Sequence, residues 1–253
     1  MISAPVQTAK VSLTLKQRLG RWLIPLFPFS RRTFEILRFE AGCLTQRLVN
    51  LLNPAYRVRI RALRRMQGLA VNLGSGGRGL PGWINMDARP NHLDHCIAYD
   101  IRRPLPFATG SVARILAEHV IEHLDFREDI PRVLEEFHRV LQHGGVVRIV
   151  VPDAERFLCA YAGNSREEFA RLGWNLDRLP SDIFTRMHVI NHVFHQDGEH
   201  QFGWDFETMS WALDRAGFEE ICRCRFGESL DPGLAIDQPN HAPYSLYVEA
   251  RKI

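Results

Sequence analysis

Cysteine is scarce in this 253-residue chain, and the cysteines present show no pairing pattern. There are five, an odd number, and none stands in a Cys-x-x-Cys arrangement. A disulfide framework uses an even set of cysteines, and a structural zinc site typically uses closely spaced ones. We therefore expect neither feature, and the cysteine usage favours a reducing compartment.

Long apolar runs are also missing. The longest, "WLIPLFPF" at residues 22–29, contains two prolines. It is far shorter than the roughly 20 residues that a membrane span needs. The first nine residues carry no basic charge ahead of an apolar segment, so we expect no cleavable signal peptide. We predict a cytoplasmic protein without internal repeats or low-complexity tracts.

Acidic residues are nearly absent from residues 1–68, which hold 13 Lys/Arg and 2 Asp/Glu, a net charge of +11. The remainder holds 19 and 27, a net charge of −8. A basic arm of this kind suits an anionic membrane surface or another polyanion. Trp22, Phe27 and Phe29 beside arginines favour a membrane interface, peripheral to its inner face. No nucleic-acid-binding motif is present, so we expect no specific nucleic-acid partner.

This arm, residues 1–68, is predicted to be a helical extension. Within residues 34–52, apolar side chains recur at spacings of three, four or seven, which places them on one helical face. Pro54 ends that helix. The alternative to a binding role is a helical cap that packs on the body and leaves its arginines in solvent. The residues of the apolar stripe are Phe34, Leu37, Leu44, Leu48 and Leu51.

From residue 69 to residue 253, β-like runs alternate with helical patterns, which is typical of an α/β fold with helices on both faces of a parallel sheet. We predict seven mostly parallel strands. They are residues 69–73, 83–87, 96–99, 112–117, 146–151, 218–226 and 244–250.

Two helices are clearly marked within this second region. One covers residues 130–141, with Asp129 as its N-terminal cap and Gly144-Gly145 as its stop. The other covers residues 206–216, with Asp205 as its cap. The polar and histidine-rich residues 153–204 interrupt the alternation. We expect them to form a lid-like insertion over the ligand crevice.

The most informative stretch is "VNLGSGGRGLPGWINMD", residues 71–87. Gly74, Gly76 and Gly79 formally match the G-x-G-x-x-G dinucleotide fingerprint, which alone is weak evidence. That fold needs a helix and then an acidic residue about 20 positions on. Here Asp87 follows Gly79 after eight residues, and Pro81-Gly82 leave no room for the helix. Asp87 nevertheless ends the second strand, where a ribose-binding carboxylate belongs.

Several motifs in order resemble the class I S-adenosylmethionine-dependent methyltransferases. They are "VNLGSGG", "WINMD", "DIRRPLPFATGSVARILAEHVIEHL" and "EEFHRVLQHGGVVRIVVPD", and the resemblance covers roughly residues 69–250. It is strongest to a bacterial branch of that family often linked to cell-surface glycan synthesis. The resemblance implies a Rossmann-like class I methyltransferase fold, with S-adenosylmethionine as the cofactor.

The resemblance also assigns roles along the chain. Many members have an acidic residue where this chain has Asn72, and a glycine where it has Arg78. The glycine turn would pass beneath the methionine moiety, Asp87 would hold the ribose, and two residues after the third strand would flank the adenine. Two more, after the fourth strand, would face the sulfonium and the substrate. In chain order, the implied cofactor-binding and substrate-facing residues are Asn72, Gly74, Ser75, Gly76, Asp87, Tyr99, Asp100, Glu118 and His119.

Histidines supply the candidates for a general base. His119 ends the fourth strand, and His200 lies in "HQFGWD", which resembles the segment that the family has ahead of its late helix. An imidazole near its ordinary pKa suits proton removal from an acceptor hydroxyl. His200 also ends a run of four histidines, at 188, 192, 195 and 200, which we interpret as a polar lid wall. We predict no metal site.

These observations favour a methyltransferase that acts on an oxygen of a small-molecule or glycan acceptor. Two alternatives stay open. One is a non-catalytic protein that binds S-adenosylmethionine as a scaffold. The other is a zinc metallohydrolase, because His119, Glu122 and His123 match the H-x-x-E-H signature of inverted zinc peptidases. On a helix, the two histidines of that signature would share a face and bind zinc.

Overall fold

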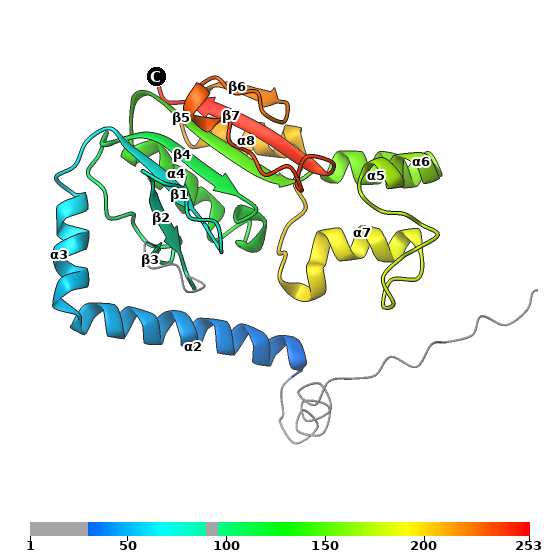
Figure 1. The fold of residues 1–253 in the computed structure, drawn as a ribbon, viewed down its shortest axis with the longest axis horizontal. Coiled ribbons are helices and arrows are strands. Elements are labelled where there is room, and N and C mark those ends of the chain that lie inside the picture. Colours follow the sequence, from blue (N-terminus) through cyan, green and yellow to red (C-terminus); the bar gives the residue numbers. More distant parts are fainter. Residues whose placement is uncertain (1–29, 90–95) are drawn as a thin grey trace, which may run out of the picture.

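The computed structural model describes residues 30–89 and 96–253, and its centre is a single seven-stranded sheet (Figure 1). The strand order is β3-β2-β1-β4-β5-β7-β6. Neighbouring strands are parallel except at β7, which is antiparallel to both β5 and β6. The mostly parallel seven-stranded sheet predicted from the sequence is therefore confirmed.

All seven predicted strands are present, with small shifts at their ends. The strands are β1 (Leu69–Leu73), β2 (Ile84–Asp87), β3 (Cys96–Ala98), β4 (Val112–Glu118), β5 (Leu141–Pro152), β6 (Glu219–Cys224) and β7 (Ser245–Arg251). The α-helices are α2 (Arg31–Leu52), α3 (Pro54–Leu63), α4 (Ile130–Val140), α5 (Ala154–Ala162), α6 (Arg166–Arg171), α7 (Arg186–His195) and α8 (Phe206–Arg215). Three short 3-10 helices are η2 (Ile121–His123), η3 (Gln196–Gly198) and η4 (Pro232–Leu234).

The hydrophobic core follows from the alternation of side chains along the strands. One face of the sheet packs with α4 and α8, where Phe137 and Met209 are fully buried. On the opposite face, Leu116 and Val146 pack with Leu234 of η4 and with the loop before β2. The carboxyl ends of β1, β2, β3 and β4 meet at one edge of the sheet, which is where ligands of open α/β sheets bind.

The ends of α4 differ from the prediction. Asp129 precedes the helix, but its side chain does not cap it. The reason is that the preceding turn, in which the backbone N–H of Asp129 donates to Asp125, holds Asp129 in a helical conformation rather than the extended one that a cap adopts. The helix also stops before Gly144-Gly145, because Leu141 already pairs with β4 in the sheet. Asp205 does cap α8 as predicted, accepting from a backbone N–H at 2.8 Å.

Residues 153–204 leave the sheet and return to it at one point, where Asp153 and Trp204 form a parallel bridge. Between them, α5, α6 and α7 pack around a small core of their own that includes Phe157, Phe169 and Val189. Figure 1 shows these helices beside the carboxyl end of β5 rather than stacked on the sheet. The segment is therefore a separately packed helical unit next to the ligand-binding edge.

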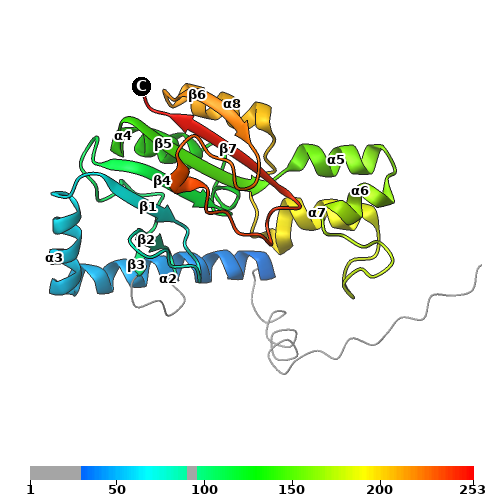
Figure 2. The same cartoon turned by 45° about the horizontal axis from the view of Figure 1, so that its top comes forward.

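The helix α2 runs along the β3 edge of the sheet in both views (Figures 1 and 2). Polar groups hold the extension there: Asn50 and the hydroxyl of Tyr56 each donate to the Ala98 carbonyl, at 3.0 and 3.1 Å. The apolar stripe of α2 does not pack on the body, since its five side chains are half exposed or more.

Part of the predicted arm cannot be compared with the structure. The apolar run at 22–29, with Trp22, Phe27 and Phe29, lies outside the described residues. Among the residues that are described, no helix is long and apolar enough to cross a bilayer.

Candidate active site

The glycine turn after β1 brings bare backbone to the sheet edge. Gly74 and Gly76 have φ of +66° and +51°, a left-handed conformation that favours glycine. A Cβ on Gly74 would lie 2.4 Å from the Val120 side chain, so the turn packs tightly against the loop after β4. A Cβ on Gly76 would meet nothing within 4 Å. The turn is thus rigid on one side and open on the other, as a cofactor cradle requires.

Asn72 stabilises the glycine turn through hydrogen bonds to the protein rather than pointing toward a ligand. Its side chain is buried, and its amide donates to the Asn85 side chain at 2.9 Å and to the Arg78 carbonyl at 3.1 Å. Asn85 in turn accepts from the backbone N–H of Leu80. An acidic side chain at position 72 would have no hydrogen to donate to these acceptors. The asparagine therefore belongs to the short connection between β1 and β2.

Asp87 ends β2 with its carboxylate beside the turn. One oxygen accepts from the Gly76 backbone N–H at 2.9 Å, and the other accepts from the backbone N–H of Arg89 at 2.7 Å. Each carboxylate oxygen has further lone pairs, and the side chain is only partly buried. Ser75 is turned away, with its hydroxyl 3.2 Å from the Cys96 sulfur. The carboxylate and the open turn fit a ribose bound at this edge.

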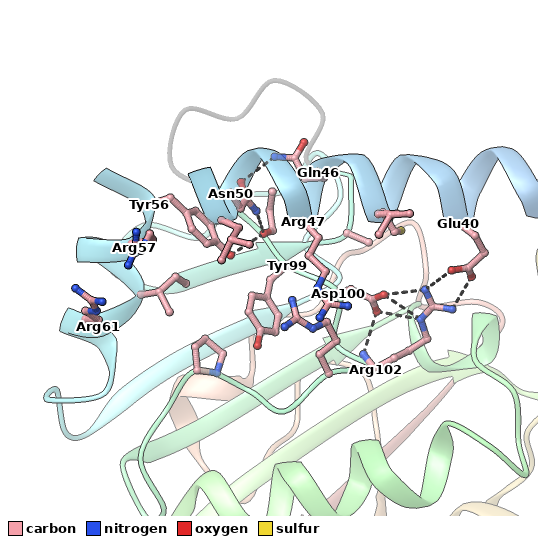
Figure 3. Close-up of a pocket in the computed structure, with 18 of the residues that line it drawn as sticks. Glu40, Gln46, Arg47, Asn50, Tyr56, Arg57, Arg61, Tyr99, Asp100 and Arg102 are labelled. Carbon is pink, nitrogen blue, oxygen red and sulfur yellow. Dashed lines mark hydrogen bonds and ion pairs between the residues drawn. The ribbon is translucent and has the colours of Figure 1, made fainter. Parts of the chain in front are cut away.

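Tyr99 and Asp100 follow β3 and line a cavity of about 700 Å³ between the sheet edge and the helices α2 and α3 (Figure 3). Tyr99 donates from its hydroxyl to the Pro104 carbonyl. Arg102 holds the carboxylate of Asp100 with contacts of 2.7 to 3.1 Å, and also pairs with Glu40 of α2 at 2.6 Å. The two residues that the resemblance places beside the adenine therefore line a cavity, and the carboxylate of Asp100 is shared with an arginine that also pairs with α2.

The lining of this cavity is basic, because arginines of the N-terminal extension face it. Within the described part of the chain, five of the arginines that line it form no ion pair with an acidic side chain, and four of these come from the N-terminal extension. The four are Arg47, Arg57, Arg61 and Arg64.

Glu118, at the end of β4, is buried and fully engaged by the protein. Its carboxylate pairs with Arg78 at 2.6 Å and accepts from Gln238 and from the Nδ1 of His241. Burial alone would raise the pKa of Glu118, but these hydrogen bonds and Arg78 hold it below its usual range. Arg78, the departure from the family pattern, thus links the glycine turn to the segment before β7. Neither Gln238 nor His241 was predicted, because they lie 120 or more residues away.

His119 has a strained backbone at the same sheet edge, with φ of +51°. The carboxylate of Glu122 accepts from its Nδ1 at 3.1 Å, and its Nε2 lies 2.9 Å from the hydroxyl oxygen of Ser245. The rings of His241 and Tyr244 stand 4.2 and 5.6 Å from the imidazole, centre to centre. The structure therefore places an oriented imidazole directly after β4.

His200, the other candidate base, is buried and does not contact His119. Its Nδ1 donates to the Val193 carbonyl at 2.7 Å, and its ring packs edge-on against His123. Burial lowers the pKa of His200, which keeps the imidazole neutral. The other three histidines of the run lie on α7 and line a shallow depression that does not include His200, at 188, 192 and 195.

The zinc-peptidase alternative does not fit the structure. It requires a helix that carries both His119 and His123 on one face. Instead, His119 lies at the end of β4, and the following element, η2, is a three-residue 3-10 helix. The ring of His119 points to Ser245 rather than toward His123. The H-x-x-E-H match is therefore coincidental in this fold.

Comparison with known proteins gives one family match. Residues 82–149 match the family model described as a methyltransferase domain. No curated protein has a sequence that matches this chain.

The solved structures that resemble the chain include three that are described as methyltransferases. A SAM-dependent methyltransferase from Archaeoglobus fulgidus is 14% identical, with a TM-score of 0.44 over 82% of this chain and 94% of its own. A protein from Thermotoga maritima described as a possible histamine N-methyltransferase is 17% identical, with a TM-score of 0.45 over 86% and 96%. Human N-acetylserotonin methyltransferase, solved with SAM, is 14% identical, with a TM-score of 0.42 over 89% and 60%.

The family match runs from Gly82, at the end of the connection between β1 and β2, into β5, and it includes Asp87. The chain carries a methyltransferase domain in the Rossmann-like class I fold, and S-adenosylmethionine is its cofactor.

Proposed function

We propose that this enzyme methylates an oxygen of a small-molecule or glycan acceptor, with His119 as the general base. S-adenosylmethionine supplies an activated methyl group on a sulfonium. A neutral hydroxyl is a weak nucleophile, so an alcohol acceptor gains most from a base that removes its proton. The observation that carries the proposal is the orientation of the His119 imidazole by Glu122.

The hydrogen bond from Nδ1 to Glu122 fixes the tautomer of His119. Because an ionised carboxylate only accepts, the proton of a neutral imidazole sits on Nδ1, and Nε2 keeps its lone pair. The Ser245 hydroxyl lies 2.9 Å from that lone pair, which is the distance needed for proton transfer. In the proposed reaction, an acceptor hydroxyl takes the place of Ser245, and Glu122 stabilises the imidazolium that forms.

The cofactor would be held by residues on neighbouring strand ends. We propose that the Asp87 carboxylate accepts from the ribose hydroxyls and that the turn around Gly76 supports the methionine moiety. Tyr99 and Asp100 would flank the adenine. Since Asp100 already accepts from Arg102, adenine binding would draw on a carboxylate that also anchors α2 through Arg102.

The acceptor class can be tested with S-adenosylmethionine and a panel of hydroxyl, amine and thiol compounds that includes phenols, monosaccharides and nucleotide sugars. We expect S-adenosylhomocysteine to form only with hydroxyl acceptors, and the product to show an O-methyl signal by NMR. Methylation confined to amines, thiols or carbon would contradict the proposal. Cofactor binding without turnover on any acceptor would instead favour the scaffold alternative.

We also propose that α2 rests on an anionic membrane surface. Residues 30–68 carry nine arginines against two glutamates, a net charge of +7. The exposed apolar stripe of α2 runs along the same segment. Apolar side chains beside arginines are the combination that binds anionic lipid.

The lipid surface can be tested by sedimentation with vesicles. We expect the protein to sediment with vesicles that contain phosphatidylserine, to be released by 0.5 M salt (a concentration at which charges are screened within about 5 Å), and to stay in solution with pure phosphatidylcholine. Leu48→Ser with Leu52→Ser should weaken sedimentation. The control is Leu158→Ser, a leucine on α5 that is about as exposed as Leu48. Equal loss in the control, or equal binding to both lipids, would overturn this proposal.

A further inference from the structure

Three side chains with metal-binding atoms converge at η2, next to the carboxyl end of β4. Glu122 and His123 come from η2, and His200 comes from the segment before α8. Their ligand atoms all lie within 4.8 Å of one another. Glu122 and His200 are buried, with exposed fractions of 1% and 6%. Two imidazoles and one carboxylate form a donor set that transition-metal ions use in proteins.

Both imidazoles are oriented by backbone carbonyls. The Nδ1 of His123 lies 3.1 Å from the Glu199 carbonyl, and the Nδ1 of His200 lies 2.7 Å from the Val193 carbonyl. A carbonyl oxygen only accepts, so in each neutral ring the proton is on Nδ1 and the lone pair is on Nε2. Metal-binding histidines are held in this way, with the second ring nitrogen donating to a carbonyl or carboxylate.

Glu122 has an oxygen that no protein group satisfies. One carboxylate oxygen accepts from His119, and the other, Oε2, is buried without a hydrogen-bond partner. Leaving a buried carboxylate oxygen unpaired is costly, and native proteins rarely do so without a reason. A cation beside Oε2 would supply the missing partner.

The backbone holds the two contributing segments together although they are far apart in sequence. The backbone N–H groups of Gln201 and Phe202 both donate to the Glu122 carbonyl, at 2.8 and 3.3 Å. His200 is therefore fixed next to η2 by bonds that do not depend on its own side chain. The ligands are preorganised before any ion binds, which lowers the cost of binding.

We propose that Glu122, His123 and His200 bind a divalent transition-metal ion, with Zn²⁺ as the preferred ion, through Oε2 and the two Nε2 atoms. Tetrahedral zinc with bonds of about 2.1 Å places its ligand atoms about 3.4 Å apart, so small side-chain rotations complete the site. Three protein ligands leave one position open to water or to an acceptor oxygen. That oxygen would lie near His119, a consequence that rests on the proposed function; the metal site itself does not.

The test uses the full-length protein after treatment with a chelator. Titration with Co²⁺ should give visible d–d absorption bands that saturate at one equivalent, and Zn²⁺ should abolish them. Mg²⁺ and Ca²⁺ should not compete, because they prefer all-oxygen sites. Calorimetry should give a micromolar or tighter Zn²⁺ dissociation constant. No saturable binding of Co²⁺ or Zn²⁺ would overturn the proposal.

The ligands are tested by Glu122→Gln, His123→Gln and His200→Gln, each of which should weaken Zn²⁺ binding at least tenfold. The matched control is His143→Gln, an exposed histidine on β5, which should leave the affinity unchanged. Circular dichroism identifies any variant that fails to fold. His123 is the least buried of the three ligands, so its replacement should disturb folding least. Unchanged affinity in folded variants would contradict the proposal. The readout of these experiments is metal binding, and methyl transfer is measured separately with the same protein. A failure of the metal-site proposal is therefore distinguishable from a failure of the proposed function.

Discussion

Replacing Arg148 with leucine should lower the free energy of unfolding by about 3–5 kcal/mol, because the change strands two buried carboxylates. The guanidinium pairs with Asp237 at 2.6 Å and with Glu249 at 2.7 Å, and all three side chains are completely buried. The measurement is chemical denaturation, together with a melting temperature that we expect to fall by about 10 °C or more.

Two further variants separate charge from packing. Arg148→Leu combined with Asp237→Asn and Glu249→Gln removes all three charges and should recover part of the stability lost by the single change. Arg166→Leu breaks a pair with Asp177 that is largely exposed, so it should cost at most about 1 kcal/mol. A single Arg148 variant as stable as Arg166→Leu would show that the buried ion pairs contribute little.

Arg148 also shows why the strands could be predicted from the sequence, whereas the ion pairs that stabilise them could not. Strand β5 is recognisable from "VVRIVV", since a buried parallel strand is an almost continuous apolar run. Nothing local to that run says where its charge is neutralised. Asp237 and Glu249 lie 89 and 101 residues further on. They stand on a loop and on the antiparallel strand β7, and only the sheet order brings them to Arg148.

The residues of the candidate site also differ in whether the sequence predicts their contacts. The glycine turn and Asp87 are separated by a few residues, so their spacing alone placed them at one edge of the sheet. The role of Glu118 depends on Gln238 and His241, more than a hundred residues away, and a single sequence does not reveal contacts at that separation. The contacts of His200 could not be predicted for a related reason. The backbone N–H groups of Gln201 and Phe202 donate to the Glu122 carbonyl and hold His200 next to η2, while its Nδ1 donates to the Val193 carbonyl of α7.

His119→Asn should reduce the rate of methyl transfer by about 10²–10⁴-fold while the affinity for S-adenosylhomocysteine stays within about twofold of the native value. The reason is that the base acts on the acceptor hydroxyl, whereas the proposed cofactor contacts come from the turn around Gly76 and from Asp87. Asparagine is smaller than histidine and keeps a polar group near Ser245, so the change should disturb packing little. Rates are measured as S-adenosylhomocysteine formed with the hydroxyl acceptor that the panel identifies.

Asp87→Ala is the contrasting variant, because it should remove cofactor binding rather than proton transfer. Hydrogen bonds to a charged carboxylate contribute about 1.5–3 kcal/mol each, so losing even one of those to the ribose should weaken S-adenosylhomocysteine binding by at least roughly tenfold in calorimetric titration. If His119→Asn lost cofactor affinity to the same extent, the imidazole would be a structural support of the cradle and not the base. If it kept the native rate, the proton would leave the acceptor by another route, and the orientation of His119 by Glu122 would need a different explanation.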